Sequence, residues 1–191
     1  PNAEYTTSGQ PLMGKTPLTA EGHSSPIIHG NRAYIVGCIK ATRQRTLVAL
    51  DAHTGKVAWE QIVLAAPLES KHSLNSYASA TPVTDGKTIY VSFLEVGNKK
   101  ITAPNVGNQR LITPGRMIVA AYNDSGKQLW LVRPGDFISA HGFCSSPVIY
   151  EDLLIVNGDH DGKGYMLALD RKTGKTVWKT DRKYGIRSYV T

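Results

Sequence analysis

Short runs of apolar residues, each bounded by turn-forming residues, recur along the whole chain of 191 residues. Three of these runs are rich in Val, Ile, Leu and Tyr, and they are Arg32-Ala33-Tyr34-Ile35-Val36, Thr88-Ile89-Tyr90-Val91-Ser92 and Leu153-Leu154-Ile155-Val156. Runs of this length and composition predict β-strands. No apolar run approaches the roughly 18 residues that a membrane span needs, and no segment has the period of a long amphipathic helix. The pattern therefore predicts an all-β protein.

Each run lies inside a larger unit that occurs three times. The unit opens with a small residue, a proline and an apolar residue, at Ser25-Pro26-Ile27, Thr81-Pro82-Val83 and Ser146-Pro147-Val148. It closes with a short apolar run, a turn containing glycine and a tryptophan, within residues 49–60, 120–131 and 168–179. Glycine supplies the positive φ that such tight turns need. The unit therefore predicts four short antiparallel strands, which we call A, B, C and D.

Tandem four-stranded units predict a β-propeller, in which blades pack around a common axis. The middle unit carries an additional loop from Glu95 to Arg116. Without that loop the repeat would be about 45 to 55 residues long, which is in the range of propeller blades. A β-sandwich is the alternative architecture, but a sandwich gives no reason to repeat one motif three times.

The repeats predict a single partial β-propeller over residues 1–191. Three blades are expected at 22–63, 76–133 and 141–181. Residues 1–21 are expected to end a preceding blade, with an outer strand at 15–18, and residues 187–191 to begin a fourth. Because a propeller needs roughly four to eight blades to close, the remainder of the same propeller is the first expected partner.

Composition and charge narrow the choice of partners. Lys and Arg number 22 against 15 Asp and Glu, a formal net charge of +7, which favours acidic partners. The basic residues are spread along the chain, however, so no nucleic-acid role is expected.

The two cysteines, Cys38 and Cys144, lie far apart, which excludes a disulfide-rich framework and a CxxC zinc site. Two free thiols are favoured over one bridge between them.

The closing elements resemble the tryptophan-docking repeat of the pyrroloquinoline-quinone (PQQ) type β-propellers. Residues 49–59 and 168–178 both fit Ala-x-Asp-x-x-Thr-Gly-Lys-x-x-Trp, whereas the middle copy has Asn123 for the aspartate and Ser125 for the threonine. Quinoprotein alcohol dehydrogenases, outer-membrane-assembly lipoproteins and secreted PQQ-like proteins of environmental bacteria share this repeat. The resemblance implies a periplasmic or extracellular protein, although no signal-peptide pattern opens this sequence.

The repeat residues are expected to hold neighbouring blades together rather than to contact a ligand. A tryptophan ring on strand D can stack on the next blade's turn, where glycine leaves room, and the aspartate can accept hydrogen bonds from turn amides. The expected docking residues are Asp51, Gly55, Trp59, Gly126, Trp130, Asp170, Gly174 and Trp178.

A candidate ligand face is expected where the D-to-A connections and B-to-C loops emerge, on one side of the disc. The polar and aromatic residues placed there are His23, His72, Asn75, Tyr77, His141, Arg187 and Tyr189. Together they favour a polar or anionic ligand, with Arg187 as the fixed charge and the histidines as donors. The alternative, which the sequence slightly favours, is that these side chains hydrogen-bond the connecting loops or fill the wall of the central channel. No metal site is expected from the histidines.

Two loops complete the candidates. The B-to-C loop of the third unit holds Asp159 and Asp161 in an Asp-x-Asp-Gly pattern, which is found in calcium loops, but the later glutamate of an EF-hand is missing. A polar turn is the favoured interpretation. The long loop from Glu95 to Arg116 can act as a lid or partner contact, or be a surface elaboration.

The sequence favours a non-catalytic binding or scaffold module with no cofactor, which binds a polar or anionic ligand or a protein partner. The alternative is a fragment of a PQQ-dependent quinoprotein dehydrogenase that uses PQQ with calcium. Resemblance to those enzymes implies adjacent cysteines beside the quinone, which this sequence lacks. Nothing supplies a nucleophile with a base beside it, so a hydrolase is not favoured.

Overall fold

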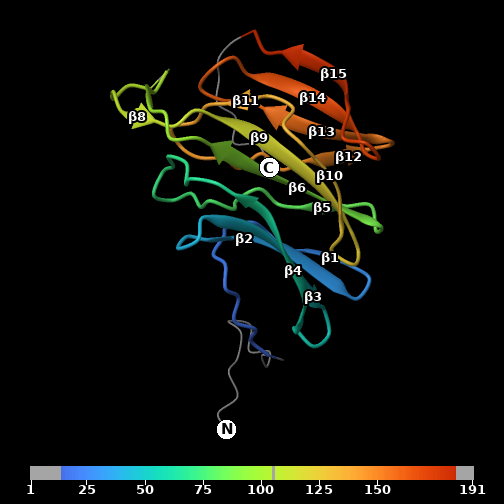
Figure 1. Ribbon diagram of the computed structural model, residues 1–191. Coiled ribbons are helices and arrows are strands. Elements are labelled where there is room, and N and C mark those ends of the chain that lie inside the picture. Colours follow the sequence, from blue (N-terminus) through green and yellow to red (C-terminus); the bar gives the residue numbers. More distant parts are fainter. Residues whose placement is uncertain (1–13, 105, 184–191) are drawn as a thin grey trace, which may run out of the picture.

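The computed structural model describes residues 14–104 and 106–183, and β-strands are the regular secondary structure of these ranges (Figure 1). Three antiparallel sheets follow one another along the chain, and each contains four strands paired in sequence order from A to D. They stack side by side from the blue strands to the red ones (Figure 1). The predicted all-β architecture of four-stranded antiparallel blades is confirmed.

The strands of the three blades have the following bounds. Blade one consists of β1 (Ile27–His29), β2 (Arg32–Ile39), β3 (Gln44–Asp51) and β4 (Val57–Ala65). Blade two consists of β5 (Val83–Thr84), β6 (Thr88–Val96), β9 (Gly115–Asn123) and β10 (Gln128–Val132), and β11 (Asp136–Phe137) pairs with β9 beyond the end of β10. Blade three consists of β12 (Val148–Tyr150), β13 (Leu153–Gly158), β14 (Tyr165–Asp170) and β15 (Thr176–Asp181). The long loop of blade two carries a separate ribbon of β7 (Ile101–Thr102) and β8 (Leu111–Ile112).

Blade two is buried on both faces because it lies between the other two blades. Successive side chains of a strand point to opposite faces of the sheet. Along β6, Ile89, Val91 and Phe93 pack in the core shared with blade one, whereas Tyr90 and Leu94 pack in the core shared with blade three. This arrangement explains why the apolar run of β6 is nearly continuous instead of alternating with polar residues.

Two tryptophans on strand D connect each blade to the next. The indole Nε1 of Trp59 donates to the carbonyl oxygen of Asp124 at 2.9 Å, and Trp130 Nε1 donates to Arg171 O at the same distance. A Cβ at Gly126 would lie 2.9 Å from the Trp59 ring, and one at Gly174 would lie 2.8 Å from the Trp130 ring. Glycine is required at both turns because its φ is positive and because the ring leaves no room for a side chain.

The small residue before each proline forms a second link between blades, near strand A. Ser25 N donates to Thr81 Oγ1 at 3.2 Å, and Thr81 N donates to Ser146 Oγ at 2.9 Å. A hydroxyl of one blade thus accepts the amide proton of the preceding blade. This role explains the Ser/Thr-Pro pattern, which the sequence shows without indicating its purpose.

The turn between strands C and D is closed by one side chain in every blade. Asp51 Oδ1 accepts hydrogen bonds from Thr54 N at 2.8 Å and from the Thr54 hydroxyl at 2.9 Å, and Asp170 does the same with Thr173. In the middle blade Asn123 Oδ1 accepts from Ser125 in the same way. The substitution of asparagine for aspartate therefore preserves the turn.

Acidification is expected to destabilise the protein through these turns. Hydrogen bonds from Thr54 and Thr173 hold the pKa of the Asp51 and Asp170 carboxyls below the ordinary value. A carboxyl whose pKa is lower in the folded state stabilises the fold above its unfolded pKa, and that stabilisation is lost as the pH falls through the folded pKa. We therefore expect the thermal unfolding midpoint, followed by circular dichroism, to fall as the pH drops below about 4.

The Asp51→Asn/Asp170→Asn variant provides the control, because Asn123 already closes the middle turn without a charge. It should unfold near the native midpoint at pH 7 and depend less on pH below 4. An acid dependence equal to that of the native protein would show that these two carboxyls are not responsible.

The segments that flank the three blades differ from the prediction or lie beyond the described ranges. Residues 14–20 were expected to contain an outer strand at 15–18, but no strand forms there. Instead the Thr16 hydroxyl donates to Gly55 O at 2.6 Å, and Glu21 pairs with Cys38 in an isolated bridge. The predicted beginning of a fourth blade at 187–191 lies outside the described residues.

Candidate functional site

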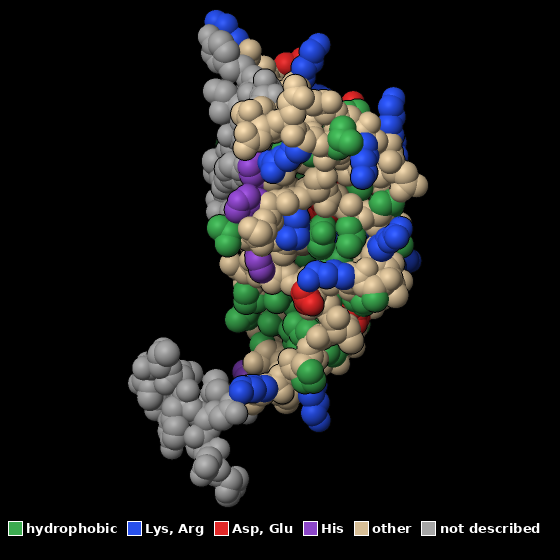
Figure 2. Space-filling model, turned by 90° about the vertical axis from the view of Figure 1, so that its left-hand side faces the viewer, with side chains coloured by type: hydrophobic (Ala, Val, Ile, Leu, Met, Phe, Trp, Pro, Cys, Tyr) green, Lys and Arg blue, Asp and Glu red, His purple; other side chains and the backbone are tan. Residues whose placement is uncertain are grey.

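The connections between strands B and C and between blades emerge on one side of the disc, because strand direction alternates within each blade. We call this side the loop face. It consists of the B-to-C loops at 40–43, 97–114 and 159–164 and the D-to-A connections at 66–82 and 133–147. Figure 2 looks onto this side. Such loops on a rigid scaffold are where binding residues commonly lie.

The loop face is rich in positive charge. The cations in its segments are Lys40, Arg43, Lys71, Lys99, Lys100, Arg110, Arg133 and Lys163. Among the described carboxylates of the same segments Asp136 is exposed, whereas Glu69, Asp159 and Asp161 are buried. Blue side chains accordingly outnumber red ones over this face, and purple histidines lie along one of its edges (Figure 2). Residues dispersed along the sequence are thus gathered by the fold onto one surface.

Three of the predicted site residues line one cavity of about 500 Å³ on this face, together with Leu74 and Cys144. They are His72, Asn75 and His141. The two imidazole rings lie with centroids 5.9 Å apart and planes 23° apart. His72 N donates to His141 O at 3.1 Å, and Asn75 Nδ2 donates to the same oxygen at 2.8 Å. These bonds join the D-to-A connections of successive blades, so the same residues hold the loops and line the cavity.

Two further predicted residues, His23 and Tyr77, line an adjoining cavity of about 200 Å³. Asn75 borders both cavities. The Tyr77 ring has the Lys71 ammonium 5.2 Å and the Arg45 guanidinium 5.8 Å from its centroid, and burial raises the pKa of its hydroxyl. The candidate ligand face is therefore divided between two neighbouring cavities.

The two aspartates of the Asp-x-Asp-Gly loop line neither of these cavities. Asp159 is buried and forms an ion pair with Arg182 at 3.0 Å, and Asp161 Oδ2 accepts a hydrogen bond from Ala140 N at 2.7 Å. Between them His160 is buried beside Phe137, and burial lowers the pKa of its imidazole. Both carboxylates hold loops of blade three in place. The other two predicted residues, Arg187 and Tyr189, lie outside the described residues.

The cation beside the histidines comes instead from the long loop of blade two. Arg110 Nη2 lies 3.2 Å from His141 Nε2. The sequence suggests a surface elaboration, a lid or a partner contact for this loop, and nothing in it connects the loop with the histidines. The pairing of β7 with β8 positions Arg110, because Arg110 immediately precedes β8. No sequence pattern marks that contact, since the two residues belong to different connections.

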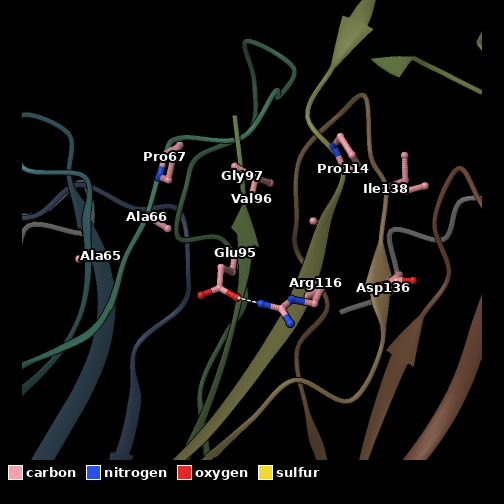
Figure 3. A pocket seen from close by; sticks show the side chains of 11 residues that line it. Ala65, Ala66, Pro67, Glu95, Val96, Gly97, Pro114, Arg116, Asp136 and Ile138 are labelled. Atoms are coloured by element: carbon pink, nitrogen blue, oxygen red, sulfur yellow. Dashed lines mark hydrogen bonds and ion pairs between the residues drawn. The ribbon is translucent and has the colours of Figure 1, made fainter. Parts of the chain in front are cut away.

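A third cavity of the loop face, about 600 Å³ in volume, lies between the end of β4 and the long loop (Figure 3). Its charged residues are Glu95, Arg116 and Asp136. Glu95 accepts hydrogen bonds from Arg116 at 3.0 Å and from Arg133 Nε at 2.6 Å, and the Arg133 bond is the main reason why the pKa of Glu95 is low. Both arginines are thereby paired with the Glu95 carboxylate, and the rest of the cavity lining consists of Asp136 and small apolar residues.

A buried ion pair supports the loop face from beneath. Arg45, at the start of β3, binds the Glu69 carboxylate, and both side chains are almost fully buried. Its guanidinium also donates to Ala66 O at 2.8 Å and to Pro67 O at 3.2 Å. Burial raises the pKa of Glu69, and the Arg45 charge opposes that rise. The pair fixes the D-to-A connection that carries His72 and Asn75.

The described residues do not fit PQQ with calcium. Cys38 lies in β2 of blade one and Cys144 in the connection between blades two and three, both as free thiols, and burial raises the pKa of both. Across 14–104 and 106–183 no group of three or more His, Cys, Asp and Glu side chains is placed to hold a metal ion. The adjacent cysteines and the carboxylate-rich ion site that the quinoprotein resemblance implies are therefore not formed by this part of the chain.

Comparison with known proteins places these features in context. A family model described as outer membrane protein assembly factor BamB matches residues 6–108 and 102–189. A lanthanide-dependent methanol dehydrogenase of Methylacidiphilum fumariolicum (strain SolV) is 27% identical over 101 residues, which are 51% of this chain and 16% of that protein.

Two solved structures share the fold at low sequence identity. Quinohemoprotein alcohol dehydrogenase from Comamonas testosteroni has a TM-score of 0.56 at 14% identity, over 85% of this chain and 21% of that one. BamB from Moraxella catarrhalis has a TM-score of 0.51 at 16% identity, over 90% of this chain and 43% of that one. The chain therefore spans less than half the length of each of these proteins. In the described ranges no helix has the length and apolar character to cross a bilayer.

Proposed function

Because the chain belongs to the family described as outer membrane protein assembly factor BamB, with its PQQ-like propeller repeats, we propose that it is a non-catalytic binding module. Its loop face holds an acidic protein partner. The charge of that face carries the proposal: its cations are mostly exposed, and its exposed carboxylates in the described segments are Asp136 and Glu21, of which Glu21 is paired with Lys40. Opposite charge steers and orients a partner more than it tightens the complex.

The opposite side of the disc is not charged in this way. Its C-to-D turns carry Lys56, Lys127 and Lys175, but aspartates at the same turns and at the neighbouring A-to-B turns offset them. Arg171, for example, forms ion pairs with Asp85 at 3.0 Å and with Asp152 at 3.5 Å. The contrast between the two sides supports the loop face as the partner surface. A periplasmic or extracellular location agrees with a family named for an outer-membrane assembly factor.

Polyglutamate is the probe for the acidic partner. We expect it to bind the native protein in fluorescence anisotropy, with an affinity that falls as salt is added, because salt screens surface charges. The variant Lys99→Gln/Lys100→Gln/Lys163→Gln should bind roughly five to ten times more weakly, since each surface charge contributes a few tenths of a kcal/mol or more. All three lysines are exposed.

The matched control is Lys56→Gln/Lys127→Gln/Lys175→Gln, which removes the same charge from the opposite side. Equal weakening by both variants would show that net charge alone drives binding and would contradict a partner surface. Tighter binding of a DNA duplex of the same total charge would favour a nucleic acid instead.

The methanol dehydrogenase relative supports the alternative of a PQQ-dependent dehydrogenase. Addition of PQQ with calcium or a lanthanide, followed by the quinone absorbance, separates the two functions. The proposal predicts no stoichiometric uptake by this chain and no dye-linked oxidation of methanol. Tight uptake together with oxidation would overturn the binding-module proposal.

A further inference from the structure

We propose that the cavity between His72 and His141 binds a carboxylate attached to an apolar group. It is named the His–Arg pocket here, and it consists of His72, Leu74, Asn75, His141 and Cys144 with Arg110 at its edge. The proposal specifies what one part of the loop face recognises, so it rests on the proposed binding function.

The size and lining of the pocket suit a small apolar group with one anionic end. Its volume of about 500 Å³ is within the usual range for small-ligand sites. Leu74 and Cys144 supply apolar surface, and the lining contains no Asp or Glu. A cationic ligand would find no counter-charge among the described lining residues, whereas Arg110, in contact with the lining residue His141, offers a positive charge to an anion.

Hydrogen bonds fix which ring nitrogens can donate. His72 Nδ1 accepts from Leu74 N at 3.2 Å, so the neutral ring carries its proton on Nε2. The guanidinium of Arg110 has donors only, so His141 Nε2 accepts in their contact at 3.2 Å. The remaining N–H groups of Arg110 and the Nε2–H of His72 are therefore donors that these two contacts leave for a ligand. An arginine fork matches the two oxygens of a carboxylate.

The backbones that carry the two histidines are held in position before a ligand arrives. Asn75 Oδ1 accepts from the Ser79 hydroxyl at 2.6 Å while its amide donates to His141 O. The His72 amide donates to that same oxygen. The two histidine backbones are thus joined at the His141 carbonyl oxygen. A site that is already ordered loses less entropy on binding. A single guanidinium with one imidazole donor, set against apolar side chains, favours a monoanion over a phosphate.

The experiment titrates the protein with phenylacetate and with its neutral analogue phenylacetamide, using isothermal titration calorimetry. Phenylacetate should bind at least tenfold more tightly. Arg110→Gln should weaken phenylacetate binding about tenfold or more, because a hydrogen bond to a charged group contributes about 1.5–3 kcal/mol. Lys100→Gln removes an equal charge from the same loop and should change the affinity less than twofold.

Leu74→Asp tests the pocket with Arg110 left unchanged. Leu74 is 82% exposed, so an aspartate there should not disturb folding, and its charge should repel a carboxylate in the pocket. Leu129→Asp on the outer strand β10 is the matched control, and it should bind phenylacetate as the native protein does.

The source of the carboxylate is decided by a second pair of probes, a tetrapeptide ending in phenylalanine with a free or an amidated C-terminus. Tighter binding of the free peptide than of phenylacetate indicates a chain terminus, and the reverse indicates a free organic acid. Equal binding of phenylacetate and phenylacetamide, or no effect of Arg110→Gln, would overturn the proposal. Polyglutamate binding without phenylacetate binding would contradict the carboxylate pocket but would still support the loop face as a partner surface.

Discussion

Replacing Trp130 with alanine is expected to lower the free energy of unfolding by about 3–5 kcal/mol, the usual cost of deleting a buried aromatic side chain. Trp130 is 9% exposed and packs in the core shared by blades two and three. Its ring lies 5.9 Å from that of Tyr90, and its indole donates to Arg171 O. The substitution therefore removes the packing and leaves that carbonyl without the indole donor. Urea unfolding followed by circular dichroism measures the change.

Trp178→Ala is the matched control, since Trp178 has the same place in the repeat. Its side chain is 37% exposed, and no blade follows β15 in the described part of the chain. We expect a loss no larger than about 1 kcal/mol, because the ring gives up little buried area. Equal losses at the two positions would mean that Trp130 does not gain its stability from the neighbouring blade.

The buried ion pair gives the second large effect. Glu69→Ala is expected to lower the free energy of unfolding by about 3–5 kcal/mol, because it leaves the Arg45 guanidinium charged and buried without its counter-ion. Arg45 is 0% exposed, and its remaining partners are backbone carbonyls such as Ala66 O. Chemical denaturation at pH 7 measures the loss.

Two further variants separate the buried charge from the loss of packing. Arg45→Met/Glu69→Leu removes both charges and should regain part of the stability lost in Glu69→Ala, because apolar replacement of a buried pair is often tolerated. Glu21→Gln breaks the exposed pair of Glu21 with Lys40 and should leave the unfolding midpoint unchanged. A double variant no more stable than Glu69→Ala would contradict this account.

The architecture could be predicted from the sequence because local signals agreed. Apolar runs such as that of β6 gave the strands, glycine gave the turns, and threefold repetition gave the blades. The same signals predicted an outer strand at residues 15–18, where the described structure forms none. Strand formation there depends on a neighbouring blade, which no local pattern supplies.

The candidate site was predictable only in part. His72, Asn75 and His141 could be placed on one side of the disc because antiparallel topology fixes where the connections emerge. Arg110 could not, since its contact with His141 depends on how a long loop folds back. The positive charge of the loop face could not be predicted for a similar reason. Its cations are distant in sequence and come together only when the blades stack.

The tryptophan and Ser/Thr links between blades all point the same way. In both tryptophan contacts and both Ser/Thr contacts, the earlier blade donates the hydrogen and the later blade accepts it. The stack consequently has two chemically different ends, with donors such as the Trp178 indole on blade three and acceptor carbonyls on blade one. Two copies meeting through their blade-three surfaces would set donor against donor. A partner that extends the stack through these same links would therefore join head to tail, whereas a twofold-symmetric pairing through either end could not form them.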